Sequence, residues 1–112
     1  MDARPPSFPG LSEAITCTAG PGLRPPRYTL RWSPANDDRT PSNAIVYDVY
    51  QATSPGGQDF ETPTYTTPAG ATSYTTPDLS PEVSYYFVVR ARDQNGNRDP
   101  NLAERLGRDL CV

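Results

Sequence analysis

Short runs in which hydrophobic and polar residues alternate recur along the chain, and turn residues separate them. Residues 28–32 alternate in this way, and the Asn/Asp-rich segment 33–38 ends the run. Because successive side chains of a strand point to opposite faces, Leu30 and Trp32 are predicted to share a buried face. Several such runs at intervals of about 8–12 residues indicate a β-sandwich or a β-barrel.

Two longer and more apolar runs show the same alternation. In residues 44–52 one face carries Ile45, Tyr47 and Val49, and the other carries Val46, Asp48 and Tyr50. In residues 84–92 one face carries Tyr85, Phe87, Val89 and Ala91, and the other carries Tyr86, Val88, Arg90 and Arg92. Both runs predict strands with one face toward the core.

The remaining strands have weaker patterns. Residues 8–16 predict a first strand, and the prolines at its start suit an edge position where no ladder N–H is needed. Residues 72–75 predict a short strand, and a last strand is expected within 102–112. Between them, Asn95-Gly96 predicts a hairpin turn, because both residues tolerate positive φ.

Composition limits the chain to a single domain. A length of 112 residues fits one core, so residues 1–112 are predicted to form one domain with 1–5 as a flexible leader. Fourteen Pro and eight Gly exclude long helices, because both residues destabilise a helix interior. The fold class is therefore all-β.

The segment that leads into residues 84–92 carries a recognisable motif. Leu79, Pro81 and Tyr85 follow one another at the spacing seen before the sixth strand of fibronectin type III domains, which this sequence resembles over about 6–110. The resemblance implies an immunoglobulin-like β-sandwich of seven antiparallel strands, with Trp32 and Tyr47 in the core. Tyr85 would be the tyrosine corner, whose hydroxyl bonds to the upstream backbone. The sequence looks most like bacterial members, which are often part of secreted or surface proteins.

Two cysteines, Cys17 and Cys111, lie near opposite ends of the chain. Without His they cannot form an ordinary zinc site, so they are either a disulfide or two unrelated thiols. The resemblance implies a disulfide, because the first strand and the seventh strand of this fold finish at the same pole. A disulfide in turn predicts an extracellular or cell-surface location.

Charge and residue types exclude several classes of function. The net charge of −3 with scattered acidic residues gives no footprint for nucleic acid. The chain has no His for a catalytic triad, and a disulfide would remove both thiols, so we expect no enzyme activity.

No run reaches the roughly 18–20 apolar residues of a membrane span. The first four residues lack the apolar region of a signal peptide, so the parent protein is expected to be longer.

A cation site is one candidate for chemistry. The resemblance brings the turn after Trp32 and the turn at Asp93 to one pole. The oxygen-bearing residues gathered there are Asp37, Asp38, Asp93, Asn95 and Asn97. Calcium takes six to eight such ligands, but Asp and Asn also cap turns, and the sequence leaves both alternatives open. No other cofactor is expected.

A protein interface is the second candidate. The outward row of the sheet formed by the third, sixth and seventh strands is expected to carry Val46, Tyr50, Tyr86, Val88 and Arg90. Tyr and Arg are enriched at interfaces, although the same residues also stabilise cross-strand pairs on a solvated sheet. Exposed Tyr could also stack on sugars.

These observations together predict a non-catalytic module of a secreted or surface-attached, bacterial protein. It would space or dock neighbouring domains or protein partners through its sheet face or loops. The alternative is an accessory polysaccharide-binding domain of a carbohydrate-active enzyme.

Overall fold

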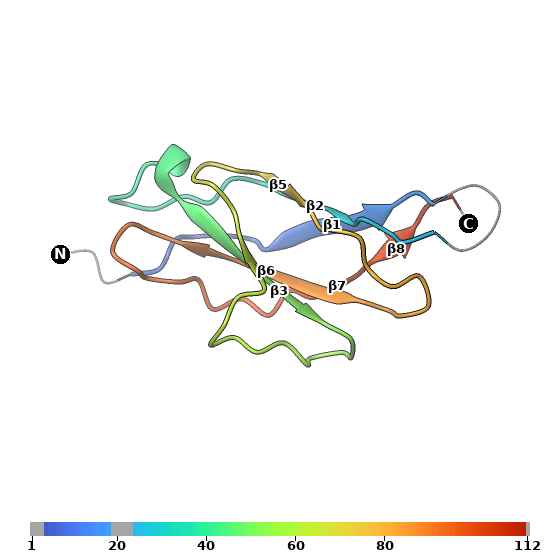
Figure 1. Cartoon of the computed structure of the whole chain (residues 1–112). Helices are drawn as coiled ribbons and strands as arrows, with labels where there is room; N and C mark the ends of the chain where they lie inside the picture. The colour runs from blue at the N-terminus through green and yellow to red at the C-terminus, as the bar shows by residue number, and fades with distance from the viewer. Residues whose placement is uncertain (1–3, 19–23, 112) are drawn as a thin grey trace.

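The computed structural model describes residues 4–18 and 24–111, which form two facing sheets (Figure 1). In chain order the elements are β1 (Leu11–Thr16), β2 (Thr29–Trp32), the 3-10 helix η1 (Ser42–Ala44), β3 (Val46–Ala52), β4 (Tyr65–Thr66), β5 (Ser73–Thr75), β6 (Tyr86–Arg92), β7 (Arg105–Leu106) and β8 (Arg108–Asp109). One sheet has the order β5-β2-β1-β8 and the other β4-β3-β6-β7. The predicted all-β sandwich is confirmed.

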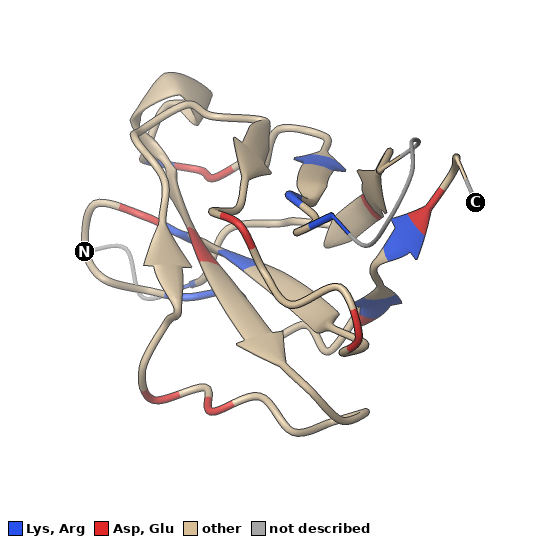
Figure 2. Cartoon of the chain, turned by 45° about the vertical axis from the view of Figure 1, so that its right-hand side comes forward, with Lys and Arg blue, Asp and Glu red and all other residues tan. Residues whose placement is uncertain are grey.

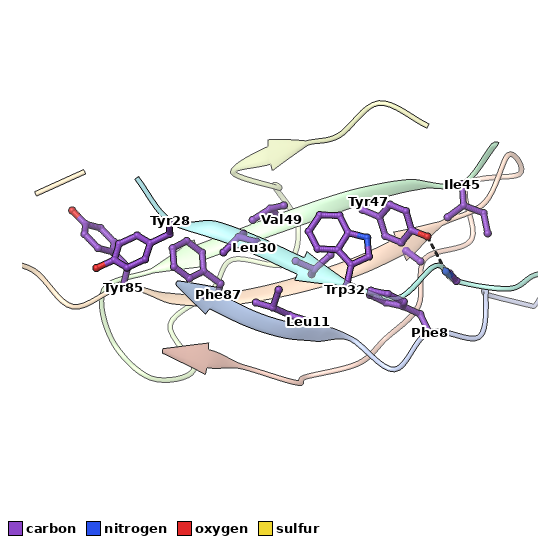
Figure 3. Close-up of a cluster of buried hydrophobic side chains, with 14 residues drawn as sticks. Phe8, Leu11, Tyr28, Leu30, Trp32, Ile45, Tyr47, Val49, Tyr85 and Phe87 are labelled. Carbon is purple, nitrogen blue, oxygen red and sulfur yellow. Dashed lines mark hydrogen bonds between the residues drawn. The ribbon is translucent and has the colours of Figure 1, made fainter. Parts of the chain in front are cut away.

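The core lies between the sheets, where the alternation predicted it. The apolar residues that the alternation assigns to the inner face of β2, β3 and β6 are buried, among them Leu30, Val49 and Phe87. The Trp32 and Tyr47 rings pack with their centroids 5.2 Å apart. Each also forms a hydrogen bond. The Trp32 Nε1–H donates to the Ala71 carbonyl at 3.0 Å. The Tyr47 hydroxyl accepts from the Ala35 N–H at 2.8 Å, the bond that Figure 3 marks with a dashed line. Aromatic side chains therefore fill the core without losing their polar contacts.

The tyrosine corner is present at the start of β6. The Tyr85 hydroxyl accepts a hydrogen bond from the Ser80 N–H at 3.0 Å, and its ring lies 6.2 Å from that of Tyr28 (Figure 3). Leu79 packs against the core and its N–H donates to the Pro26 carbonyl at 2.9 Å. The turn before β6 is thus closed by the Tyr85–Ser80 hydrogen bond and held at two points to the segment that leads into β2.

The last strand divides at Gly107 and joins both sheets. β7 pairs antiparallel with β6, whereas β8 pairs parallel with β1. Gly107 allows the crossing because a Cβ there would lie 2.6 Å from Cε1 of the Tyr28 ring. Counted as one strand divided at Gly107, β7 and β8 give the described residues the expected seven strands, and the pairing of β8 with β1 is the one parallel pairing among them.

The position of β1 also differs from the prediction. It lies between β2 and β8, so it is not an edge strand. Its N-terminal prolines precede Leu11 and need no ladder partner. A β-bulge between Leu11 and Glu13 lets Leu11 and Ala14 both face the core although they are three residues apart.

Three local predictions need smaller corrections. The strand expected over 44–52 begins at Val46, because η1 takes residues 42–44. The Thr/Pro-rich stretch contains β4, which has too few residues to show a period. At the hairpin only Gly96 has positive φ (84°), and its N–H donates to the Asp93 carbonyl at 3.2 Å. In a three-residue hairpin loop only the last loop residue, here Gly96, takes the left-handed backbone conformation.

The two described ends of the chain lie at opposite ends of an elongated molecule (Figure 1). The principal extents are 55 × 24 × 18 Å. Arg4 lies at one end, where its guanidinium pairs with Asp38 at 2.9 Å, and Cys111 lies at the other. Of the predicted leader 1–5, residues 1–3 fall outside the described part. Within the described ranges, no helix has the length and apolar character needed to cross a bilayer.

Candidate functional site

The outer face of the β4-β3-β6-β7 sheet contains a buried charge cluster. The Asp48 side chain on β3 is 0% exposed and accepts a hydrogen bond from the Thr66 hydroxyl at 2.8 Å. Arg92 Nε and Arg98 Nε lie 3.0 and 2.8 Å from its Oδ2. Both arginine side chains remain about one-third exposed, at 33% and 32%. They therefore cover the carboxylate while keeping contact with water.

The cluster determines the protonation state of Asp48. Burial alone would raise the pKa of this carboxyl, but hydrogen bonds from Arg92 and Thr66 and the charges of Arg92 and Arg98 outweigh it and lower the pKa. The group is therefore ionised at neutral pH. A carboxylate held by two arginines is a structural ion pair and has no free oxygen for acid–base chemistry.

An aromatic side chain from the loop between β3 and β4 covers the neighbouring part of the same face. The Phe60 ring lies 5.0 Å from the Tyr50 ring, and the Arg90 guanidinium lies 3.7 Å from the Phe60 centroid. Tyr50 and Val88 are each only 1% exposed. The expectation that these two residues are exposed is wrong, because the face they share is covered. Tyr50 is consequently not available to stack on a sugar.

The Tyr50 hydroxyl is left without a hydrogen-bond partner among the described residues, although it is buried. Burial raises the pKa of this hydroxyl, partly offset by the charge of Arg98. A buried polar group that forms no hydrogen bond costs about 1–3 kcal/mol. The loop that covers this face therefore leaves one hydroxyl, that of Tyr50, without a hydrogen bond.

The apolar surface that remains open lies at the rim of this face. Val46, Tyr86 and Arg90 are half-buried, whereas Leu102 and Leu106 are 71% and 45% exposed. A hollow of about 260 Å³ lies beside Leu102. Its lining residues are Gly56, Gln58, Phe60, Val88, Leu102 and Glu104. The open surface thus belongs mainly to β7 and to the loop before it, where no alternating pattern predicted it.

Two of the residues proposed for a cation site, Asp37 and Asp93, cap turns. The Asp93 carboxylate accepts hydrogen bonds from the N–H groups of Asn95 and Asn97, both at 2.9 Å. Asp37 accepts from the Thr40 N–H at 2.8 Å, and Asp38 pairs with Arg4. The two turns are neighbours as expected, since the Gln94 N–H donates to the Thr40 hydroxyl at 3.2 Å.

No group of three His, Cys, Asp or Glu side chains in the described part of the chain could hold a metal ion. The arrangement favours turn capping, which was one of the two alternatives for these residues. Calcium binding itself stays a prediction to be tested.

The disulfide pole lies at the opposite end of the sandwich. Cys17 and Cys111 are bonded, with their Cα atoms 5.0 Å apart, which confirms the pairing. The bond closes a loop with a sequence separation of 94, and the chain-entropy model gives this a stabilisation of roughly 4–5 kcal/mol. A groove of about 650 Å³ beside it is lined by apolar residues and by Arg24, Arg27 and Arg31. Arg27 pairs with Asp78 at 2.7 Å.

In the view of Figure 2, acidic and basic residues of the described part of the chain are interspersed over both sheets and the loops.

Comparison with known proteins places this geometry in a family. A model of the fibronectin type III domain matches residues 22–104. The chain belongs to the fibronectin type III family. Fibronectin type III domains are commonly non-catalytic modules, and the disulfide and the fold are compatible with an extracellular location.

Two solved fibronectin type III structures resemble the chain over almost its whole length. A "Fn3-like protein from Clostridium thermocellum" is 28% identical with a TM-score of 0.67, and the match covers 96% of each chain. The structure called FN3tt is 18% identical with a TM-score of 0.58, over 93% of this chain and 95% of that one, which shows the fold alone. No curated protein matches the chain.

The sequence gives little or no signal for several residues that shape this fibronectin type III domain. Phe60 lies in a polar loop, and nothing in its neighbourhood shows that it covers Tyr50. Alternation places Asp48 on the outer face. It lies opposite Arg90 on β6, and Arg92 lies two residues further along β6 on the same face, so an ion pair could have been predicted. Asp109, which binds the residue after Cys17, gives no signal at all.

Proposed function

We propose that this fibronectin type III domain is a non-catalytic extracellular module that spaces and docks neighbouring domains in a secreted or surface-attached bacterial protein. The observation that carries the proposal is the position of the two described ends at opposite poles of a 55 Å long molecule (Figure 1). A domain with this arrangement adds its full length to the distance between its neighbours.

The extracellular part of the proposal is supported by the disulfide. Disulfides persist in oxidising compartments, and reducing systems remove most of them from the cytosol. Both cysteines are solvent-exposed, so a cytosolic reductant would reach them. The resemblance to a Clostridium thermocellum protein supports a bacterial source.

The non-catalytic part is supported by the side chains that the chain offers. It has no His, both sulfurs are bonded to each other, and Asp48 is held by two arginines. Docking would use the open rim of the β3–β6 face, where Leu102 and Leu106 are exposed next to the half-buried Tyr86. Apolar surface of this kind, with Arg and Tyr beside it, suits a protein contact.

Two measurements test the proposal. Antibodies against the domain should label intact cells or the culture medium of the organism that makes it, and surface label should disappear after protease treatment. Detection in the cytosol alone, with both thiols free, would contradict the extracellular assignment.

Docking is tested by hydrogen exchange of residues 100–106 in the isolated domain and in the parent protein. We expect slower exchange in the parent, because a neighbouring domain would cover Leu102 and Leu106. A Leu102→Glu variant should lose that protection, whereas Ser73→Glu, on the exposed strand β5 of the other sheet, should keep it. Equal exchange in both proteins would argue against docking at this rim.

A further inference from the structure

The disulfide shortens the covalent path between the two ends of the domain. A pulling force that enters at Arg4 and leaves at Cys111 passes along residues 4–17 and then crosses directly from Cys17 to Cys111. Residues 18–110 lie in the closed loop between the two cysteines. Because covalent bonds carry the tension, these residues are outside the force path while the disulfide is intact.

The segment that does lie on the path already spans the molecule. Arg4 is held at one pole by Asp38, and Cys17 lies at the other, with β1 between them (Figure 1). A strand rises about 3.3 Å per residue, and a fully stretched chain reaches at most about 3.6 Å per residue. Pulling on residues 4–17 can therefore add little length, even if they leave the sheet.

This segment is also held on both sides. β1 pairs with β2 along most of its length, and Ile15 and Thr16 pair with β8 on the other side. The Arg105 Nε–H donates to the Leu11 carbonyl at 3.1 Å. A force along the strand axis loads these hydrogen bonds together, since the strand must slide past both neighbours before any one of them is free.

The two ends of the bridge are fixed to each other by more than the sulfurs. The Asp109 carboxylate accepts hydrogen bonds from the Thr18 hydroxyl and from the Cys111 N–H, the latter at 2.9 Å. The Leu110 N–H donates to the Thr16 carbonyl at 3.0 Å. The backbone on both sides of the disulfide is thus held in place, and force passes from β1 to the C-terminal residues over a short distance.

We infer that this domain is a load-bearing tether of nearly fixed length, in which the Cys17–Cys111 disulfide keeps pulling force off the loop between the two cysteines when the ends are pulled apart. The use of this property in a parent protein rests on the proposed spacer function, whereas the property itself does not. With the disulfide intact, extension of the ends should add less than about 20 Å. Without it, complete unfolding should add about 300 Å.

Single-molecule force spectroscopy on the full chain, pulled through handles at its two ends, tests the inference. The oxidised protein should show steps below about 20 Å, and the same molecules in dithiothreitol should show steps of about 300 Å. A Cys17→Ser, Cys111→Ser variant should behave like the reduced protein. Reduction of folded molecules on the instrument keeps the test valid if that variant fails to fold.

A second pulling geometry serves as the control. Ser54 and Glu82 are both exposed and both lie inside the closed loop, so handles attached there draw force through residues 54–82. The oxidised protein should then give a step of several tens of Å, about what 28 residues release.

A step near 300 Å in the oxidised protein pulled from its ends, or no difference on reduction, would overturn the inference. So would the lack of a step in the control, because the disulfide would then not be the reason for the short extension. If the domain proves cytosolic while the oxidised protein still resists extension, the spacer function fails and the mechanical inference stands.

Discussion

Replacing Asp48 tests the buried charge cluster most sharply. Asp48→Ala removes the acceptor of the Thr66 hydroxyl and of two guanidinium groups. Breaking a buried ion pair costs about 3–5 kcal/mol when the remaining charge stays uncompensated. Arg92 and Arg98 are each about one-third exposed and can regain water, so we expect a smaller loss of about 2–3 kcal/mol. In a domain of this size that lowers the melting temperature by roughly 10–20 °C.

Urea unfolding followed by the fluorescence of Trp32, the single tryptophan, measures this loss. The matched control is Asp38→Ala, which removes the same side chain from the solvent-exposed pair with Arg4 and should cost less than about 1 kcal/mol. If the two variants lose equal stability, the cluster around Asp48 is no more than a surface ion pair, and the reasoning fails.

The same residue predicts a pH dependence with a defined sign. The folded protein holds the pKa of Asp48 below its unfolded value of about 3.9, so on acidification the unfolded chain binds the proton first. The stability that Asp48 contributes is therefore complete above about pH 5 and is lost as the pH falls through the folded pKa. The gap between the wild type and Asp48→Ala should shrink between pH 6 and pH 3. A gap that stays constant would contradict the lowered pKa.

Four further outcomes follow from the structure. Tyr85→Phe removes the hydrogen bond of the tyrosine corner and should cost about 1–2 kcal/mol in urea unfolding, because a backbone N–H loses its partner. The same change at Tyr50 should cost nothing and can add up to about 1 kcal/mol, since its buried hydroxyl has no partner among the described residues; a large loss there would contradict the covered face. Gly107→Ala should cost about 1–3 kcal/mol, because its Cβ would overlap the Tyr28 ring, and an unchanged midpoint would argue against the crossing of β7 to β8. Calcium at millimolar concentration should leave the melting temperature unchanged, because Asp37 and Asp93 already cap turns and Asp38 pairs with Arg4, and a clear rise would contradict this expectation.

The sequence predicts those parts of the fold in which inward and outward side chains alternate regularly along a strand. β3 and β6 are each seven residues long, and alternation over that length separates Tyr47 and Phe87 from their outward neighbours. The tyrosine corner depends on a few residues at fixed spacing and could be predicted for the same reason. The disulfide could be inferred only through the topology that the family resemblance supplied.

The parts that the sequence does not predict are those where tertiary contacts decide. β4, β7 and β8 are two residues each, which is too short for any alternation to show. Alternation also tells which side chains share a face, but not whether a loop covers that face. Alternation places Tyr50 and Val88 on the correct side of β3 and β6, but Phe60 and its loop cover the face that they share. The exposed apolar residues beside this face are instead Leu102 and Leu106. Leu106 lies in the two-residue strand β7, and Leu102 lies in the loop before it.

The most direct test is peptide mapping of the protein isolated from the organism that produces it, after free thiols are blocked and without reduction. Strand order, the crossing at Gly107 and an oxidising compartment together predict one cross-linked peptide that joins Cys17 to Cys111. Recovery of both cysteines as blocked thiols, or of either one linked to another partner, would contradict the account.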